Sequence, residues 1–155
     1  MAKFTRRSHV DADLEAVWEF HSRIEGLEAL TPWWAGLRVE SLDVPDGGEI
    51  LEAGTEMTLS VGPFPGGPRV RFVSEIVSRD RTAGEAVFVD VMRAGPFESW
   101  RHTHRFVAAN DGTRLHDEIE YATGYGPVVD WALKPGLVLG FAGRHRKTRE
   151  ILARA

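Results

Sequence analysis

The chain has 155 residues, a length that fits one domain with a core of its own. Its hydrophobic fraction of 43% and charged fraction of 27% are ordinary for a globular protein, and a net charge of −4 gives no electrostatic basis for binding nucleic acid. The absence of cysteine excludes disulfide bonds, thiolate metal ligands and a cysteine nucleophile.

The sequence predicts neither a signal peptide nor a membrane span. Residues 1–4 do not open an apolar segment, and no apolar run reaches the roughly 18 residues that cross a bilayer. We therefore expect a cytoplasmic protein that does not insert into membranes and that exists as a monomer or homodimer.

The beginning of the chain predicts one strand followed by two short helices. Residues 3–10 alternate as in a strand, and an aspartate can cap a helix over residues 14–23. A second helix over residues 25–30 should end at Thr31, because the residue before a proline avoids the helical region.

Six more strands and one long helix complete the predicted fold. The strands cover residues 37–44, 55–61, 69–78, 86–93, 98–108 and 113–123. Residues 128–152 are apolar at helical spacing, and Pro135 with Gly136 is expected to kink or break this helix. Because a large antiparallel sheet must cover one face, we predict an α+β fold in which a curved sheet wraps around the C-terminal helix, with a pocket between them.

The stretch from Gly95 to Gly126 carries the most informative pattern. Two alternating runs flank a turn at Asn110-Asp111-Gly112, which is typical of a hairpin. One face of the first strand should carry Trp100, His102, His104 and Phe106. One face of the second should carry Leu115, Asp117, Ile119 and Tyr121. A structural sheet face rarely collects so many polar groups, so we interpret this surface as the wall of a cavity.

His102, His104 and Asp117 are the candidate catalytic residues. Asp117 can orient one imidazole and raise its pKa, which would create a base able to remove a proton from carbon. Two alternatives stay open. The histidines can be buried structural groups that Asp117 satisfies, or they can contact a ligand without catalysis.

A metal at this place is a weaker hypothesis. The two-residue rise of a strand predicts that the rings of His102 and His104 lie about 7 Å apart, and Asp117 could supply a third ligand. Cupin metal sites with this histidine spacing need a glutamate a few residues later, and residues 105–109 contain none. We therefore expect no metal and no cofactor.

Aromatic residues and one further carboxylate complete the predicted site. The candidates for ligand contact are Trp33, Trp34, Phe88, Asp90, Trp100, Tyr121, Trp131 and Phe141. Trp33 and Trp34 are adjacent, so one should enter the cavity while the other covers the sheet edge or faces a partner. Trp131 is expected to face inward. The alternative strand register would leave Asp90 in solvent.

The chain resembles the START-like, or SRPBCC, superfamily of helix-grip ligand-binding proteins, and within it the polyketide cyclase/dehydrase-like (CoxG-like) group. The matching segments are Thr31-Pro32-Trp33-Trp34, Gly95-Pro96-Phe97 and the two alternating strands of the hairpin. The resemblance implies a hydrophobic cavity between the sheet and the C-terminal helix, and it favours Asp90 pointing inward. It also implies that some members are enzymes and that many only bind or carry ligands.

These observations predict one ligand-binding domain over residues 1–155. We expect it to bind a hydrophobic small molecule such as a lipid, polyketide or isoprenoid in an internal cavity. The alternative is a cyclase or dehydratase in which His102 or His104 is the base and Asp117 holds it. A third hypothesis is a partner-binding module that uses Trp33 and the rim of the pocket.

Overall fold

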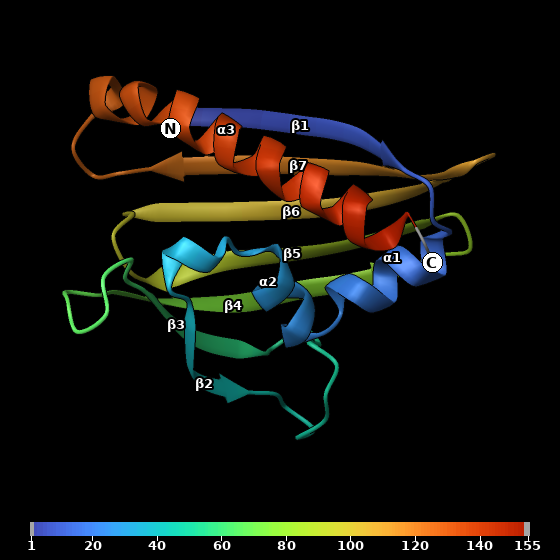
Figure 1. The fold of residues 1–155 in the computed structure, drawn as a ribbon, viewed down its shortest axis with the longest axis horizontal. Helices are drawn as coiled ribbons and strands as arrows, with labels where there is room; N and C mark the ends of the chain where they lie inside the picture. Colours follow the sequence, from blue (N-terminus) through green and yellow to red (C-terminus); the bar gives the residue numbers. More distant parts are fainter. Residues whose placement is uncertain (1, 154–155) are drawn as a thin grey trace.

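A seven-stranded antiparallel sheet forms the body of the protein in a computed structural model that describes residues 2–153 (Figure 1). The strands are β1 (Ala2–Val10), β2 (Arg38–Asp43), β3 (Glu56–Val61), β4 (Val70–Arg81), β5 (Glu85–Ala94), β6 (Ser99–Ala109) and β7 (Gly112–Ala122). Their order in the sheet is β1-β7-β6-β5-β4-β3-β2, so the chain meanders from β2 to β7 and β1 closes the far edge. The predicted fold class is confirmed.

The helices all lie on one side of the sheet (Figure 1). They are α1 (Leu14–His21), α2 (Ile24–Leu30), the short 3₁₀ helix η1 (Trp33–Ala35) and α3 (Pro127–Leu152). Asp13 caps α1, because its side chain accepts a hydrogen bond from the Ala16 amide at 2.8 Å. Thr31 ends α2 in extended conformation, as the following proline predicts.

Of the kink or break predicted at Pro135 and Gly136, the break does not occur, because helix α3 runs continuously through Pro135. Proline removes one backbone hydrogen bond, which costs most when the freed carbonyl is buried. Pro135 and Trp131, whose carbonyl loses its partner, both lie on the exposed side of α3. Water can therefore satisfy the free carbonyl, and the helix continues.

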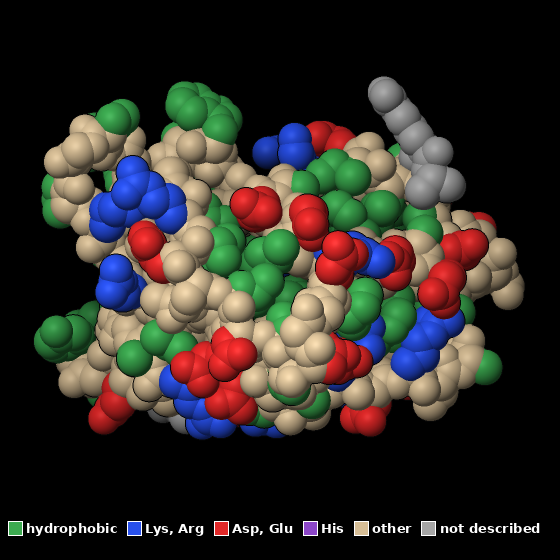
Figure 2. Space-filling view, turned by 90° about the horizontal axis from the view of Figure 1, so that it is seen from below, with side chains coloured by type: hydrophobic (Ala, Val, Ile, Leu, Met, Phe, Trp, Pro, Cys, Tyr) green, Lys and Arg blue, Asp and Glu red, His purple; other side chains and the backbone are tan. Residues whose placement is uncertain are grey.

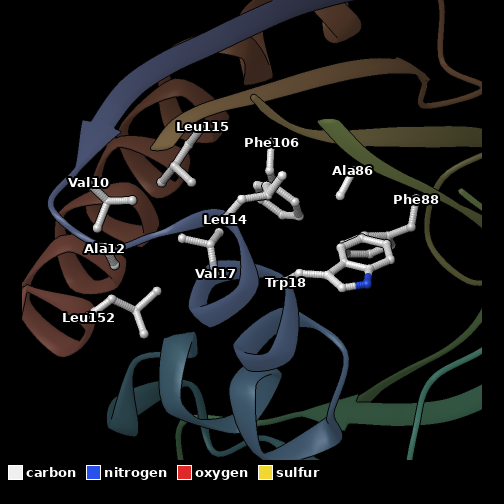
Figure 3. Close-up of a cluster of buried hydrophobic side chains, with 10 residues drawn as sticks. All are labelled: Val10, Ala12, Leu14, Val17, Trp18, Ala86, Phe88, Phe106, Leu115 and Leu152. Carbon is white, nitrogen blue, oxygen red and sulfur yellow. The ribbon is translucent and has the colours of Figure 1, made fainter. Parts of the chain in front are cut away.

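The core consists of three clusters beneath the helices. In the first, Leu14, Val17 and Trp18 of α1 pack against residues of β5, β6 and β7 (Figure 3). The second lies near α2 and contains Leu51, Met57, Leu59 and Ile76. The third joins the middle of α3 to β1 and β7 through Phe4, Ile119 and Tyr121.

Strand β2 is the outermost strand opposite β1. Nearly all of its residues are exposed, and its pairing with β3 shifts register between Val39 and Ser41. On the face that carries this edge, hydrophobic side chains are interspersed with acidic and basic ones (Figure 2). No helix within residues 2–153 is long and apolar enough to cross a membrane.

Candidate functional site

The predicted hairpin brings the polar side chains of β5, β6 and β7 to one place. Strands β6 and β7 pair from Ser99 to Ala109, which sets His104 opposite Asp117. On the other side of β6, Asp90 of β5 lies opposite His102. Side chains directly opposite one another across antiparallel strands share a face, so the register alone assembles two imidazoles and two carboxylates.

Asp117 connects three elements of the fold. Its Oδ1 accepts a hydrogen bond from His102 Nε2 at 2.6 Å, and its Oδ2 accepts one from His145 Nε2 of α3. Ser8 Oγ of β1 lies 2.6 Å from the other ring nitrogen of His145. The resulting chain of contacts, Ser8–His145–Asp117–His102, is buried beneath α3 apart from the half-buried Ser8.

A different carboxylate holds His104. Its Nε2 donates to Asp90 Oδ2 at 2.7 Å, and Phe88 stacks on its ring with a centroid separation of 3.8 Å. The ring centroids of His102 and His104 are 3.5 Å apart, so the predicted separation of about 7 Å is wrong. The strand rise fixes only the backbone spacing, whereas side chains can lean along the strand toward each other.

Burial and neighbouring charges set the protonation of this cluster. Burial raises the pKa of Asp117, but the adjacent imidazoles of His102 and His145 outweigh it and hold the pKa well below its usual range. The pKa of Asp90 is lowered in the same way, chiefly by its hydrogen bond to His104. Burial lowers the pKa of His104 to about 4, with a further contribution from His102. His104 is therefore neutral at pH 7.

A cavity of about 220 Å³ opens beside this cluster. Its polar residues are His21, Arg23, Thr31, Ser74, Asp90, His102, His104 and Arg144, and its apolar ones are Leu27, Leu30, Leu37, Leu51, Met57, Leu59, Val61, Phe72, Ile76 and Phe88. Most of the apolar wall comes from α2, β3 and β4, and α3 contributes Arg144. The pocket thus lies nearer to α2 than the prediction of a space along α3 suggests. Asp90 points inward, as the resemblance favours.

The other predicted ligand contacts separate into several places. Trp100 lines a second cavity of about 260 Å³, which Asp90 shares. Trp33 and Trp34 line a groove of about 750 Å³ against the exposed side of α3, so neither enters the cavity beside the histidines. Trp131 is 75% exposed, and the prediction that it faces inward is wrong.

Tyr121 and Phe141 lie in the core. The Tyr121 hydroxyl, predicted as a ligand contact, donates to the carbonyl of Asp130 at 2.5 Å, and the side chain is fully buried. The ring of Phe141 meets that of Phe4 edge-on and lies 5.0 Å from the ring of His102, so it supports the histidine from behind.

Sequence reasoning missed Ser8, His21, Arg144 and His145. A signal for His145 existed in the helical spacing. Phe141, His145, Thr148 and Leu152 follow one another at intervals of four, three and four residues, which places them on one face of a helix. The last three are buried. A histidine in the middle of this buried helix face therefore indicates a buried polar site as strongly as the two histidines of β6 do.

A family model described as "Polyketide cyclase / dehydrase and lipid transport" matches residues 1–155. The chain belongs to this family. The family lies within the SRPBCC superfamily, in agreement with the resemblance found in the sequence. No curated protein matches the chain.

Solved structures similar to this polyketide cyclase / dehydrase family member share its fold at low sequence identity. CV1439 from Chromobacterium violaceum has a TM-score of 0.70 at 12% identity, covering 97% of this chain and 96% of that one. A point mutant of Thalictrum norcoclaurine synthase, in complex with a transition-state analogue, has a TM-score of 0.65 at 17% identity, covering 99% and 94%.

A third similar structure is a two-domain protein. The di-domain ARO/CYC StfQ from the steffimycin biosynthetic pathway has a TM-score of 0.68 at 13% identity, covering 98% of this chain and 50% of that one. These likenesses confirm the helix-grip fold.

Proposed function

We propose that the protein binds a hydrophobic small molecule with one polar oxygen group in the cavity between the sheet and α2. A lipid, polyketide or isoprenoid fits this description. The observation that carries the proposal is a cavity whose wall is apolar except for a polar region containing Asp90, His102, His104 and Arg144. We keep a cytoplasmic location, and a monomer or homodimer, as part of this proposal.

The cavity has the properties that a ligand site requires. Its volume of about 220 Å³ is far larger than the roughly 10–15 Å³ that a cavity needs to hold one water molecule. Burying apolar ligand surface contributes about 25 cal/mol per Å², while a few polar groups fix orientation. Asp90 Oδ2 accepts a hydrogen bond from His104 Nε2 at 2.7 Å, so these two side chains are fixed in position at the cavity wall.

Filling the cavity tests the proposal. Native mass spectrometry identifies any ligand that copurifies, and titration with the fluorescent probe 1-anilinonaphthalene-8-sulfonate measures binding. Leu59→Phe replaces an aliphatic side chain of the cavity wall with a larger aromatic one that fills part of the cavity. The variant should therefore bind the probe at least about tenfold more weakly. Leu133→Phe makes the same change at an exposed position of α3 and should bind like the wild type. Equal binding by the two variants would contradict the proposal.

A second candidate is a cyclase or dehydratase that uses His102 as base. The observation in its favour is that Asp117 holds Nε2 of His102 at 2.6 Å while the same ring lines the cavity. StfQ and norcoclaurine synthase, by their names, show that this fold can carry enzymes.

This candidate is tested by the exchange of α-protons in an aryl methyl ketone dissolved in D₂O, followed by NMR. If His102 is a base, the wild type accelerates exchange and His102→Ala abolishes the acceleration while probe binding stays nearly unchanged. If the protein only binds ligands, the wild type does not accelerate exchange.

A further inference from the structure

Three potential ligand atoms converge on the cavity wall. Asp90 Oδ2 lies 2.7 Å from His104 Nε2 and 3.8 Å from His102 Nδ1. The ligand atoms of these three residues lie within 4.8 Å of one another. Two ligands at zinc distances of about 2.0–2.2 Å, arranged tetrahedrally, are roughly 3.3 Å apart. The observed separations of 2.7 and 3.8 Å bracket that value.

The far nitrogens of both rings face the same second carboxylate. Asp117 Oδ1 lies 2.6 Å from His102 Nε2 and 3.5 Å from His104 Nδ1. Metal-bound histidines usually donate their other N–H to a carboxylate, which fixes the ring and its tautomer. Asp117 occupies that outer position for His102 through a hydrogen bond, and the contacts of His145 and Ser8 hold it there.

One contact of the cluster is too long for a direct hydrogen bond. His102 Nδ1 faces Asp90 Oδ2 at 3.8 Å. A bound cation can take the place between these two atoms.

We propose that Asp90, His102 and His104 form a binding site for a divalent transition metal such as Zn²⁺, with a coordination position open to the cavity. Two imidazoles and one carboxylate are a common ligand set for such ions. The third ligand comes from β5 rather than from the residues that follow the histidines, which is why the sequence did not indicate it. The inference shares the cavity of the proposed function but does not depend on an apolar ligand.

The test is metal titration of protein that has been treated with EDTA and dialysed. Calorimetry with ZnCl₂ and visible absorption with CoCl₂ should both show one ion per chain, and Co²⁺ should give the intense bands of a four- or five-coordinate site. His104→Ala and Asp90→Ala should abolish saturable binding. His116→Ala removes a partly exposed histidine of β7 and should leave binding unchanged.

Asp117→Asn tests the role of the outer carboxylate apart from that of the three metal ligands. It should keep the stoichiometry of one ion and weaken affinity about 10–100-fold. Failure of the wild type to bind either ion, or equal affinity in His104→Ala, would overturn the metal site. Binding of 1-anilinonaphthalene-8-sulfonate, measured on the same samples, reports separately on the apolar cavity. Circular dichroism shows whether each variant is folded, and the wild-type titration decides the question if a variant is not.

Discussion

Asp117 joins a strand of the sheet to the long helix through two buried hydrogen bonds. Its two oxygens hold His102 of β6 and His145 of α3, and His145 in turn contacts Ser8 of β1. A carboxylate with such partners stays charged inside the protein, and removal of one partner from a buried ionic contact leaves the others unsatisfied. Asp117 therefore ties the long helix to the middle of the sheet.

Asp117→Ala should lower the free energy of unfolding by about 3–5 kcal/mol, because His102 and His145 both lose their acceptor. Urea denaturation at pH 7 measures this change. The matched control is Glu118→Ala on the same strand, which removes only a half-exposed ion pair with Lys3 and should cost less than about 1 kcal/mol. Similar losses in both variants would show that Asp117 has no special structural role.

The lowered pKa of His104 predicts loss of stability in mild acid. Between its ordinary value of 6.5 and its folded value of about 4, the unfolded chain binds a proton that the folded protein does not. The free energy of unfolding should therefore fall with pH over this window, by roughly 3 kcal/mol from this residue.

His104→Gln tests this prediction by urea denaturation at several pH values. The variant should show a flatter dependence between pH 6.5 and 4. Asp117 acts in a lower window. Its folded pKa is depressed, so its contribution is present above its ordinary pKa and disappears as the pH falls toward the folded value. Below pH 4 the variant should therefore still lose stability. Identical slopes above pH 4 in variant and wild type would contradict the assignment to His104.

At the scale of elements, α3 combines a buried face near its end with an exposed face rich in glycine. His145, Thr148 and Leu152 are buried, whereas Gly136 and Gly140 are exposed, and a Cβ at either glycine would meet no neighbouring atom. Glycine lowers helix stability because it loses more backbone entropy on folding than alanine does. The helix is held by its contacts with the sheet rather than by its own helical propensity.

Gly140→Ala should therefore raise the free energy of unfolding by up to about 1 kcal/mol, measured by thermal and urea denaturation. Gly26→Ala in α2 is the control: it makes the same substitution in a helix, but at a position with no room for a Cβ. A Cβ there would lie 2.1 Å from the Phe20 carbonyl oxygen, so the backbone must shift and stability must fall. Destabilisation by Gly140→Ala would contradict this prediction, because it would mean that another group fills the space beside Gly140.

The sequence predicted elements better than it predicted the contacts between them. Alternation in β6 and β7 follows from backbone geometry, so the faces of His102 and Asp117 could be predicted locally. That Asp90 holds His104 depends on the register with β5, and that His145 reaches Asp117 depends on the rotation of α3 over the sheet. Neither is encoded by spacing within one element.

Trp131 shows a related limit of prediction from composition. A large apolar side chain favours burial, but burial requires a neighbouring surface. In the first turn of α3, the preceding residue Asp130 faces the end of β7 and is buried against Tyr121 and Thr123, whereas Trp131 faces away from the sheet. The same residue type is therefore buried in α1, as Trp18, and exposed in α3.

Over the whole molecule, stability should decrease from the centre of the sheet toward β2. Strand β6 is paired on both sides and carries buried residues, whereas β2 pairs only with β3 and is mostly exposed. Amide hydrogen exchange followed by mass spectrometry should show rapid exchange in β2 through local opening and the slowest exchange in β6. Equal protection of the two strands would mean that the sheet opens only as one unit.

The irregular edge at β2 also has a consequence for encounters between copies of the protein. A flat, uncovered edge strand is a template for addition of a strand from another molecule. Here the shifted register between Val39 and Ser41 disrupts the row of free backbone groups, and Arg38, Glu40 and Asp43 place charges along it. Strand β3, which lines the cavity, is the direct neighbour of β2, and β4 follows it in the sheet. Resistance to self-association at this edge therefore also preserves the shape of the cavity.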